Sequence, residues 1–202
     1  MNFQTPHHRI LIFVAIFWVV SIVVGTSKIN SYNSRPGDRS EVSMDWPAAS
    51  AIARDAHQPT LIMFAHPRCP CTDASIGELD TLLADIGNRV KVSVVFYQPA
   101  DVDAGWMQTR LRRAAESIPG VTVLLDPEGR ETRRFGAETS GHVYLYSPEG
   151  RLLFEGGITP SRAHAGENFG RSSITALAQG QQPSHNRTPV FGCPILGLGA
   201  QL

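Results

Sequence analysis

Two of the chain's three cysteines are separated by a single residue in the stretch FAHPRCPCTDAS. Paired thiols suit disulfide exchange, in which a thiolate attacks a disulfide and a second thiol completes the reaction. Pro70, between Cys69 and Cys71, is a residue type favoured at the first position of a helix. We therefore expect Cys69 to cap a helix and Cys71 to lie in its first turn. Unpaired amides and the helix dipole lower the pKa of a thiol there.

These positions suggest different roles for the two sulfur atoms. Cys69 is the expected attacking thiolate, with positive charge supplied upstream by His66 and Arg68, and Cys71 is the expected resolving thiol. A disulfide across one intervening residue closes a strained ring, which makes the bond easier to reduce. Cys193, in the tail sequence TPVFGCPIL, is either a further resolving thiol or a tail residue packed beside its apolar neighbours. The pair could instead consist of inert core thiols, which are common.

A Cu(I) carrier is the main alternative function. Two thiolates bind this soft ion well, and an imidazole can complete the site. His164, in GGITPSRAHAGENFG, is the candidate, so the alternative ligand set is Cys69, Cys71 and His164. Disulfide exchange needs no cofactor, whereas this alternative needs copper. A binding module without chemistry would leave the Cys-Pro-Cys unexplained.

The hydrophobic pattern predicts the elements that position the thiols. A short apolar run before the cysteines indicates a buried strand, and apolar residues at helical spacing follow them. A right-handed crossover makes the first two strands parallel, so the sulfur atoms lie beyond the carboxyl end of a strand. The fold class is α/β, a mixed central sheet flanked by helices. The expected strands cover 60–66, 90–99 and 121–126, with a hairpin over 142–158 that turns at Ser147–Gly150. The expected helices cover 48–56, 70–87, 106–118 and 131–135, and Ser172 or Ser173 could cap a last helix that ends at Ala178.

An apolar run from Ile10 to Val24 precedes all of these elements. As a helix it reaches roughly 22 Å, short of the roughly 30 Å hydrocarbon core of a membrane. We expect a transmembrane helix, either a membrane anchor or an uncleaved signal, over 1–25, a flexible linker over 26–45, one folded domain over 46–180, and a tail containing Cys193 over 181–202.

The net charge and the paired cysteines indicate which partners and which cellular compartment to expect. The formal net charge is zero and no basic block is present, so nucleic-acid binding is not expected. A paired-thiol site suits an oxidising compartment, so we expect a single-pass protein with its domain on the outer side of the membrane. Lys and Arg counts alone would favour the opposite orientation.

Several of these segments resemble a membrane-anchored, thioredoxin-like domain over about 46–180. LLDPEGRETRRFGAETS and VYLYSPEGRLLFEGG resemble the TlpA and peroxiredoxin-like branch, while FAHPRCPCT, GGIT and TPVFGCP resemble the RedB-type group. The resemblance implies a thioredoxin fold, dithiol chemistry, and protein or small-molecule thiols and disulfides as partners. It also implies a single-pass protein of a bacterial inner membrane with its domain on the periplasmic side. A peroxiredoxin-like thiol peroxidase is a second alternative, although FAHPRCPCT lacks the threonine that precedes a peroxidatic cysteine.

The chain departs from the family pattern at two places. The usual Cys-x-x-Cys is Cys69-Pro70-Cys71, and a gapless alignment with that motif would make Cys71 the attacker. The family's Thr–cis-Pro turn is replaced by Ser140-Gly141. That proline shapes a peptide-binding platform and discourages metal binding, so Ser140 and Gly141 join the expected site.

Overall fold

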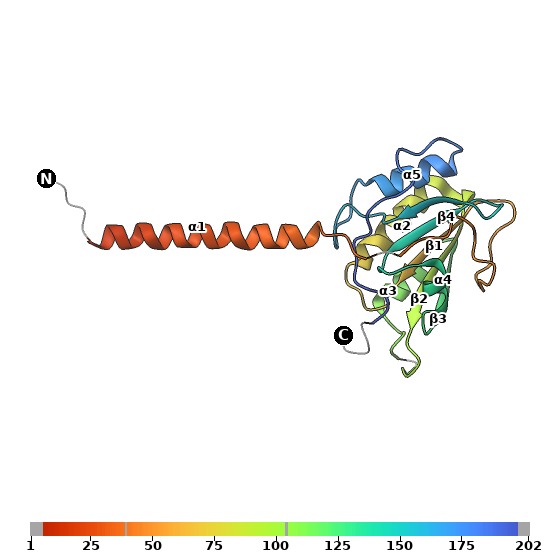
Figure 1. Ribbon diagram of the computed structural model, residues 1–202, viewed down its shortest axis with the longest axis horizontal. Coiled ribbons are helices and arrows are strands. Elements are labelled where there is room, and N and C mark those ends of the chain that lie inside the picture. Colours follow the sequence, from red (N-terminus) through yellow and green to blue (C-terminus); the bar gives the residue numbers. More distant parts are fainter. Residues whose placement is uncertain (1–5, 39, 104, 198–202) are drawn as a thin grey trace. The chain divides into compact units, whose positions relative to one another are not determined.

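The computed structural model describes residues 6–38, 40–103 and 105–197, which divide into two compact units at the Arg35–Pro36 bond. The first unit is helix α1, Pro6–Asn33 (Figure 1). Within it, His8–Asn33 has a mean hydropathy of 2.6 and is long and apolar enough to cross a membrane. The helix continues eight residues beyond the predicted end at residue 25. Gly25 alone does not end it, and the next helix-breaking pair is Pro36-Gly37.

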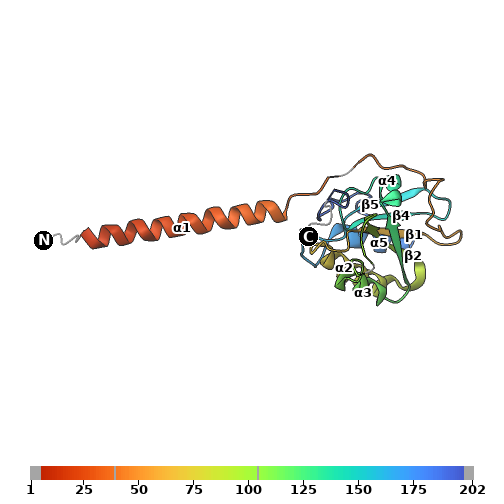
Figure 2. The same cartoon turned by 90° about the horizontal axis from the view of Figure 1, so that it is seen from below.

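The second unit is built on a five-stranded sheet in the order β3-β2-β1-β4-β5. Figure 1 labels β1 to β4, and Figure 2 labels β5. Strands β1 (Thr60–Ala65), β2 (Lys91–Gln98) and β3 (Val121–Pro127) are parallel. Strands β4 (His142–Tyr146) and β5 (Leu152–Gly156) form the predicted hairpin, and β4 pairs antiparallel with β1. Central strand β1 is buried along its whole length, as its unbroken apolar sequence predicts.

Helices cover both faces of this sheet, which confirms the α/β fold class. On one face lie α2 (Thr72–Ile86), followed by the short η1 (Gly87–Arg89), with α3 (Arg110–Glu116) and α5 (Phe169–Ala178). On the other lies α4 (Arg130–Phe135), whose Phe135 packs among aromatic residues of β1 and β4. Figure 2 shows α4 and the α2–α3 pair on opposite sides of the sheet.

Several predicted helices differ from the structure. Helix α5 begins at Phe169, because Asn168 rather than Ser172 or Ser173 is its N-cap and accepts from the Arg171 amide. Residues 48–56 form turns and bends, because the side chain of Ser50 accepts a hydrogen bond from the Ile52 amide and Glu131 binds both Ser50 and the Ala51 amide. Such local bonds satisfy backbone groups that a helix would otherwise pair. Helix α3 begins only after Thr109, whose hydroxyl accepts from the Arg112 amide.

The segment expected to be a flexible linker is hydrogen-bonded to the folded domain from residue 36 onward. The Gly37 amide donates to the Val190 carbonyl at 2.8 Å, and the Thr139 hydroxyl donates to the Asp38 carbonyl at 2.7 Å. Trp46 then packs edge-on against Phe135. These long-range contacts, together with the half-buried Val42 that packs against the core, hold residues 36–38 and 40–45 against the domain.

Candidate functional site

The cysteine pair lies in a tight turn between β1 and α2. The Cys69 amide donates to the His66 carbonyl at 3.1 Å, and the Thr72 amide donates to the Cys69 carbonyl at 3.2 Å. Helix α2 begins at Thr72 with Cys71 as its N-cap, whereas the sequence predicted Cys69 there. Cys71 already has helical backbone angles. The predicted and observed N-caps therefore differ only in the residue at which the first hydrogen-bonded turn of the helix begins.

The tail brings the third cysteine to this turn. The Ser140 amide donates to the Cys193 carbonyl, and the Ile195 amide donates to the Glu138 carbonyl, both at 2.8 Å. This short antiparallel pairing requires Gly192, because a Cβ there would lie 1.9 Å from the Ser140 carbonyl oxygen. The sulfur atoms of Cys69, Cys71 and Cys193 consequently lie within 4.8 Å of one another.

All three thiols are free, and two of them are more buried than the sequence suggested. Cys69 is 2% exposed and Cys71 is 7% exposed, whereas Cys193 is partly exposed. Both sulfur atoms of the pair are therefore almost closed to solvent, although an attacking thiolate has to be reached by its substrate. The sequence could not indicate this, because the tail that covers the turn follows it by more than 100 residues.

Hydrogen bonds to the Cys69 sulfur determine which of the three cysteines is ionised. They lower its pKa to about 4, chiefly through the Cys193 thiol and then through the Thr72 side chain and amide, against the opposing effect of burial. Burial and the Cys69 charge raise the pKa of Cys71. Donation to Cys69 raises the pKa of Cys193 further. The cluster therefore holds one thiolate, on Cys69, and two thiols.

Ser140 connects the turn to the sheet through a chain of hydrogen bonds. Its hydroxyl accepts from the His66 amide at 2.8 Å and lies 2.6 Å from the Thr72 hydroxyl. Since the single hydroxyl proton of Thr72 is donated to the Cys69 sulfur, the bond between the two hydroxyls is donated by Ser140. The sequence analysis missed Thr72, although its place directly after the pair was a usable signal.

Gly141 allows this close approach of β4 to the cysteine turn. Its φ is +92°, its amide donates to the Phe64 carbonyl at 2.8 Å, and a Cβ would lie 2.8 Å from the Ser75 hydroxyl. Among the described residues no peptide bond is cis. Ser140 and Gly141 thus form the predicted contact with the site without the family's proline.

His66 does not supply the positive charge expected of it. The ring is buried, and burial lowers its pKa, so it is neutral near pH 7. Its Nδ1 accepts a hydrogen bond from the Arg68 amide at 3.2 Å, which places the proton on Nε2. The Arg68 guanidinium lies 4.9 Å from the centre of the Trp106 ring, in a cation–π contact.

Arg162 is the cation that does act on the cluster. Its charge counteracts the rise in the Cys71 pKa, and its guanidinium donates to the Gly192 carbonyl, next to Cys193. His164 is exposed, and its Nδ1 contacts the Arg162 carbonyl at 2.5 Å. Within the described part of the chain, the group of possible metal ligands consists of the three cysteines and does not contain His164.

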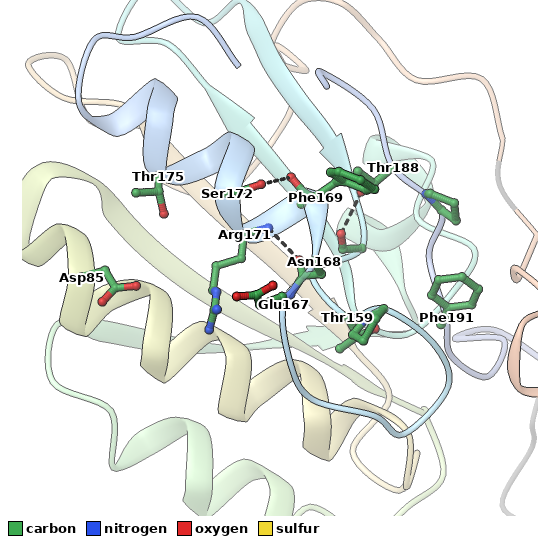
Figure 3. Close-up of a pocket in the computed structure, with 14 residues that line it drawn as sticks. Asp85, Thr159, Glu167, Asn168, Phe169, Arg171, Ser172, Thr175, Thr188 and Phe191 are labelled. Carbon is green, nitrogen blue, oxygen red and sulfur yellow. Dashed lines mark hydrogen bonds between the residues drawn. The ribbon is translucent and has the colours of Figure 1, made fainter. Parts of the chain in front are cut away.

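A groove of about 740 Å³ lies beside the tail, between the start of α5, the loop after β5 and residues 188–191 (Figure 3). Phe169, 65% exposed, and Phe191 supply aromatic surface, and the Thr188 hydroxyl donates to the Gly157 carbonyl at its edge. The lining contains none of the three cysteines. The groove is therefore a separate feature that adjoins the tail segment carrying Cys193.

No family model and no curated protein sequence matches the chain. Among solved structures, a hypothetical protein from Sinorhizobium meliloti 1021 has a TM-score of 0.60 at 21% identity over 78% of this chain and 96% of its own. An uncharacterized conserved protein from Geobacillus kaustophilus has a TM-score of 0.57 at 19% identity, over 80% and 92%. A secreted Mycobacterium tuberculosis disulfide oxidoreductase homologous to E. coli DsbE has a TM-score of 0.44 at 16% identity, over 62% and 83%.

The strand order and pairing of the sheet give this chain a thioredoxin-like fold. The mixed sheet, the cysteine-bearing turn before α2 and the closing hairpin and helix agree with that assignment. At these identities the likeness concerns the fold alone. Membership of the TlpA or RedB-type group stays a prediction.

Proposed function

We propose that this protein is a membrane-tethered thiol–disulfide oxidoreductase in which Cys69 attacks and Cys193 resolves. The observation that carries the proposal is the meeting of three sulfur atoms within 4.8 Å at the start of α2. The depressed pKa of Cys69 supports its role, because the thiolate is the species that attacks a disulfide.

The reaction needs no group beyond the thiols. The Cys69 thiolate attacks one sulfur of a client disulfide, forming a mixed disulfide and releasing the other client sulfur as a thiolate, which takes a proton. Cys193 then loses its proton and attacks the Cys69 sulfur. The second client sulfur leaves, so the client is reduced by two electrons and this protein gains a Cys69–Cys193 disulfide. An external dithiol resets it, and the same steps in reverse oxidise a client dithiol.

The sequence predicted Cys71 as the resolving thiol, whereas this proposal assigns that role to Cys193. Cys193 already donates its hydrogen bond to Cys69, so its sulfur is directed at the atom it must attack. Cys71 starts the helix and is separated from Cys69 only by Pro70, so a bond between them would close a strained ring. Cys71 then acts beside the reacting pair, through its effect on the charge of the cluster.

Helix α1 supports the tether. Its described side chains are exposed from His8 to Tyr32, and its apolar stretch satisfies the length needed to cross a membrane. We propose a single-pass anchor with the thioredoxin-like domain on the periplasmic side of a bacterial inner membrane, where disulfide exchange is favoured.

A redox titration of the full chain in detergent tests the thiol chemistry. The protein is equilibrated in glutathione buffers, quenched by alkylation, and its disulfides are mapped by mass spectrometry. We expect a Cys69–Cys193 disulfide that persists in Cys71→Ser, and no dithiol exchange by Cys69→Ser. A predominant Cys69–Cys71 bond would overturn the resolving role of Cys193, and no disulfide in any buffer would overturn the function. Rapid consumption of hydrogen peroxide with no exchange of client disulfides would favour the peroxidase instead.

A further inference from the structure

The same three sulfur atoms also have the arrangement of a soft-metal site. Two come from the turn before α2 and one from the tail, and all lie within 4.8 Å of one another. We propose that Cys69, Cys71 and Cys193 form a three-thiolate site that binds one Cu(I) ion. This inference goes beyond disulfide exchange, and it gives Cys71 a role that the exchange reaction does not require.

The spacing fits three-coordinate binding. With metal–sulfur bonds of about 2.3 Å, a planar trigonal site has its sulfur atoms about 4.0 Å apart. The widest pair therefore has to close by less than about 1 Å, which side-chain rotation can supply. The backbone need not move, because Cys193 is fixed by the Ser140 amide and Cys69 by the His66 carbonyl.

The donor set favours Cu(I) over other ions. Thiolates are soft ligands that select Cu(I), zinc and iron–sulfur clusters. Structural zinc sites and iron–sulfur clusters generally use four protein ligands. Within the described residues, no carboxylate or imidazole joins the three sulfur atoms. Cu(I) is stable with three sulfur ligands and needs no fourth.

Nearby positive charge suits the loaded site. Cu(I) displaces the protons of the Cys71 and Cys193 thiols, which pass to solvent, and the resulting three thiolates and Cu(I) together carry a net charge of −2. The 15-residue helix α2 begins at the site with its positive dipole end, and the Arg162 guanidinium acts on Cys71 and contacts the Gly192 carbonyl. Burial of Cys69 and Cys71 keeps water from competing for the ion. Because any disulfide among the three removes two ligands, copper binding and oxidation exclude each other.

Competition with a chromophoric Cu(I) chelator tests the site. The reduced full chain in detergent is titrated anaerobically, and X-ray absorption counts the sulfur neighbours of the bound ion. We expect one Cu(I) per chain with three sulfur ligands. Cys71→Ser and Cys193→Ser should each weaken the affinity by more than about 100-fold, beyond the 10- to 100-fold typical of residues outside the ligand shell. The chain carrying a Cys69–Cys193 disulfide should bind no Cu(I).

His164→Ala is the matched control, since His164 lies outside the sulfur group, and its affinity should equal that of the parent. The proposal would be overturned if His164→Ala lost Cu(I) binding or if Cys71→Ser kept the affinity of the parent. It would also be overturned if X-ray absorption of the parent showed only two sulfur ligands. Cys71→Ser also separates the two proposals, because it should weaken copper binding by more than about 100-fold while its Cys69–Cys193 disulfide still forms. Circular dichroism of each variant checks that it is folded, and the disulfide-bonded parent tests the site without any substitution.

Discussion

Replacing Cys193 by alanine should raise the pKa of Cys69. The thiol of Cys193 is the largest cause that lowers this pKa from its ordinary 9.0 to about 4. A hydrogen bond to a charged group contributes about 1.5–3 kcal/mol, and one pKa unit corresponds to about 1.36 kcal/mol. Removing the donor should therefore raise the Cys69 pKa by about 1–2 units, while the Thr72 hydrogen bonds keep it below its ordinary value.

The assay is the rate of iodoacetamide alkylation of Cys69 as a function of pH, followed by mass spectrometry. It is done in a Cys71→Ser background so that Cys69 is the only thiol in the turn. Cys193→Ser is the matched control, since its hydroxyl can still donate, and its shift should be smaller than that of Cys193→Ala. A Cys69 pKa that is unchanged in Cys193→Ala, or equal shifts in the two variants, would refute the role assigned to this hydrogen bond.

The same ionisation should affect stability. A pKa lowered on folding means that the thiolate form contributes stability above the unfolded pKa of about 9, and that this contribution is lost as pH falls through the folded pKa of about 4. The Tm of the reduced parent minus that of Cys69→Ser should therefore increase from pH 5 to pH 8. A difference that is flat or decreasing over that range would contradict the assignment of the charge to Cys69.

Three further predictions concern the scaffold. Ser140→Ala removes a buried hydroxyl with two hydrogen-bond partners, so the free energy of unfolding measured with denaturant should fall by about 1–3 kcal/mol. The control Ser172→Ala, at an exposed position, should change it by no more than about 0.5 kcal/mol. Equal losses in the two variants would contradict the role of Ser140. Gly192→Ala should displace the tail and sharply reduce the yield of disulfide-linked Cys193 in mass mapping, whereas Gly77→Ala, with open space at its Cβ, should not. Val19→Asp in α1 should cost about 3 kcal/mol of membrane insertion and increase the protein released by alkaline carbonate; unchanged fractionation would argue against the anchor.

The local elements could be predicted from sequence because each depends on neighbouring residues. Strand β1, the cysteine turn and helix α2 follow from one apolar run, two prolines and a helical spacing of leucines and isoleucines. The Ser147–Gly150 turn similarly predicted the β4–β5 hairpin. With the handedness of the first crossover, these elements limit the sheet to few arrangements, so the fold class was accessible.

Tertiary structure alone decided how the sulfur atoms meet. Cys193 reaches Cys69 through pairing between segments 138–140 and 193–195, more than 50 residues apart, and through the missing side chain of Gly192. The burial of Cys69 and the proximity of Arg162 belong to that packing, whereas the neutral state of His66 follows from burial of its ring beside Tyr97 and Trp106. Local sequence fixes where a thiol sits along a helix, but its charge depends on the donors and the solvent that the rest of the chain places around it.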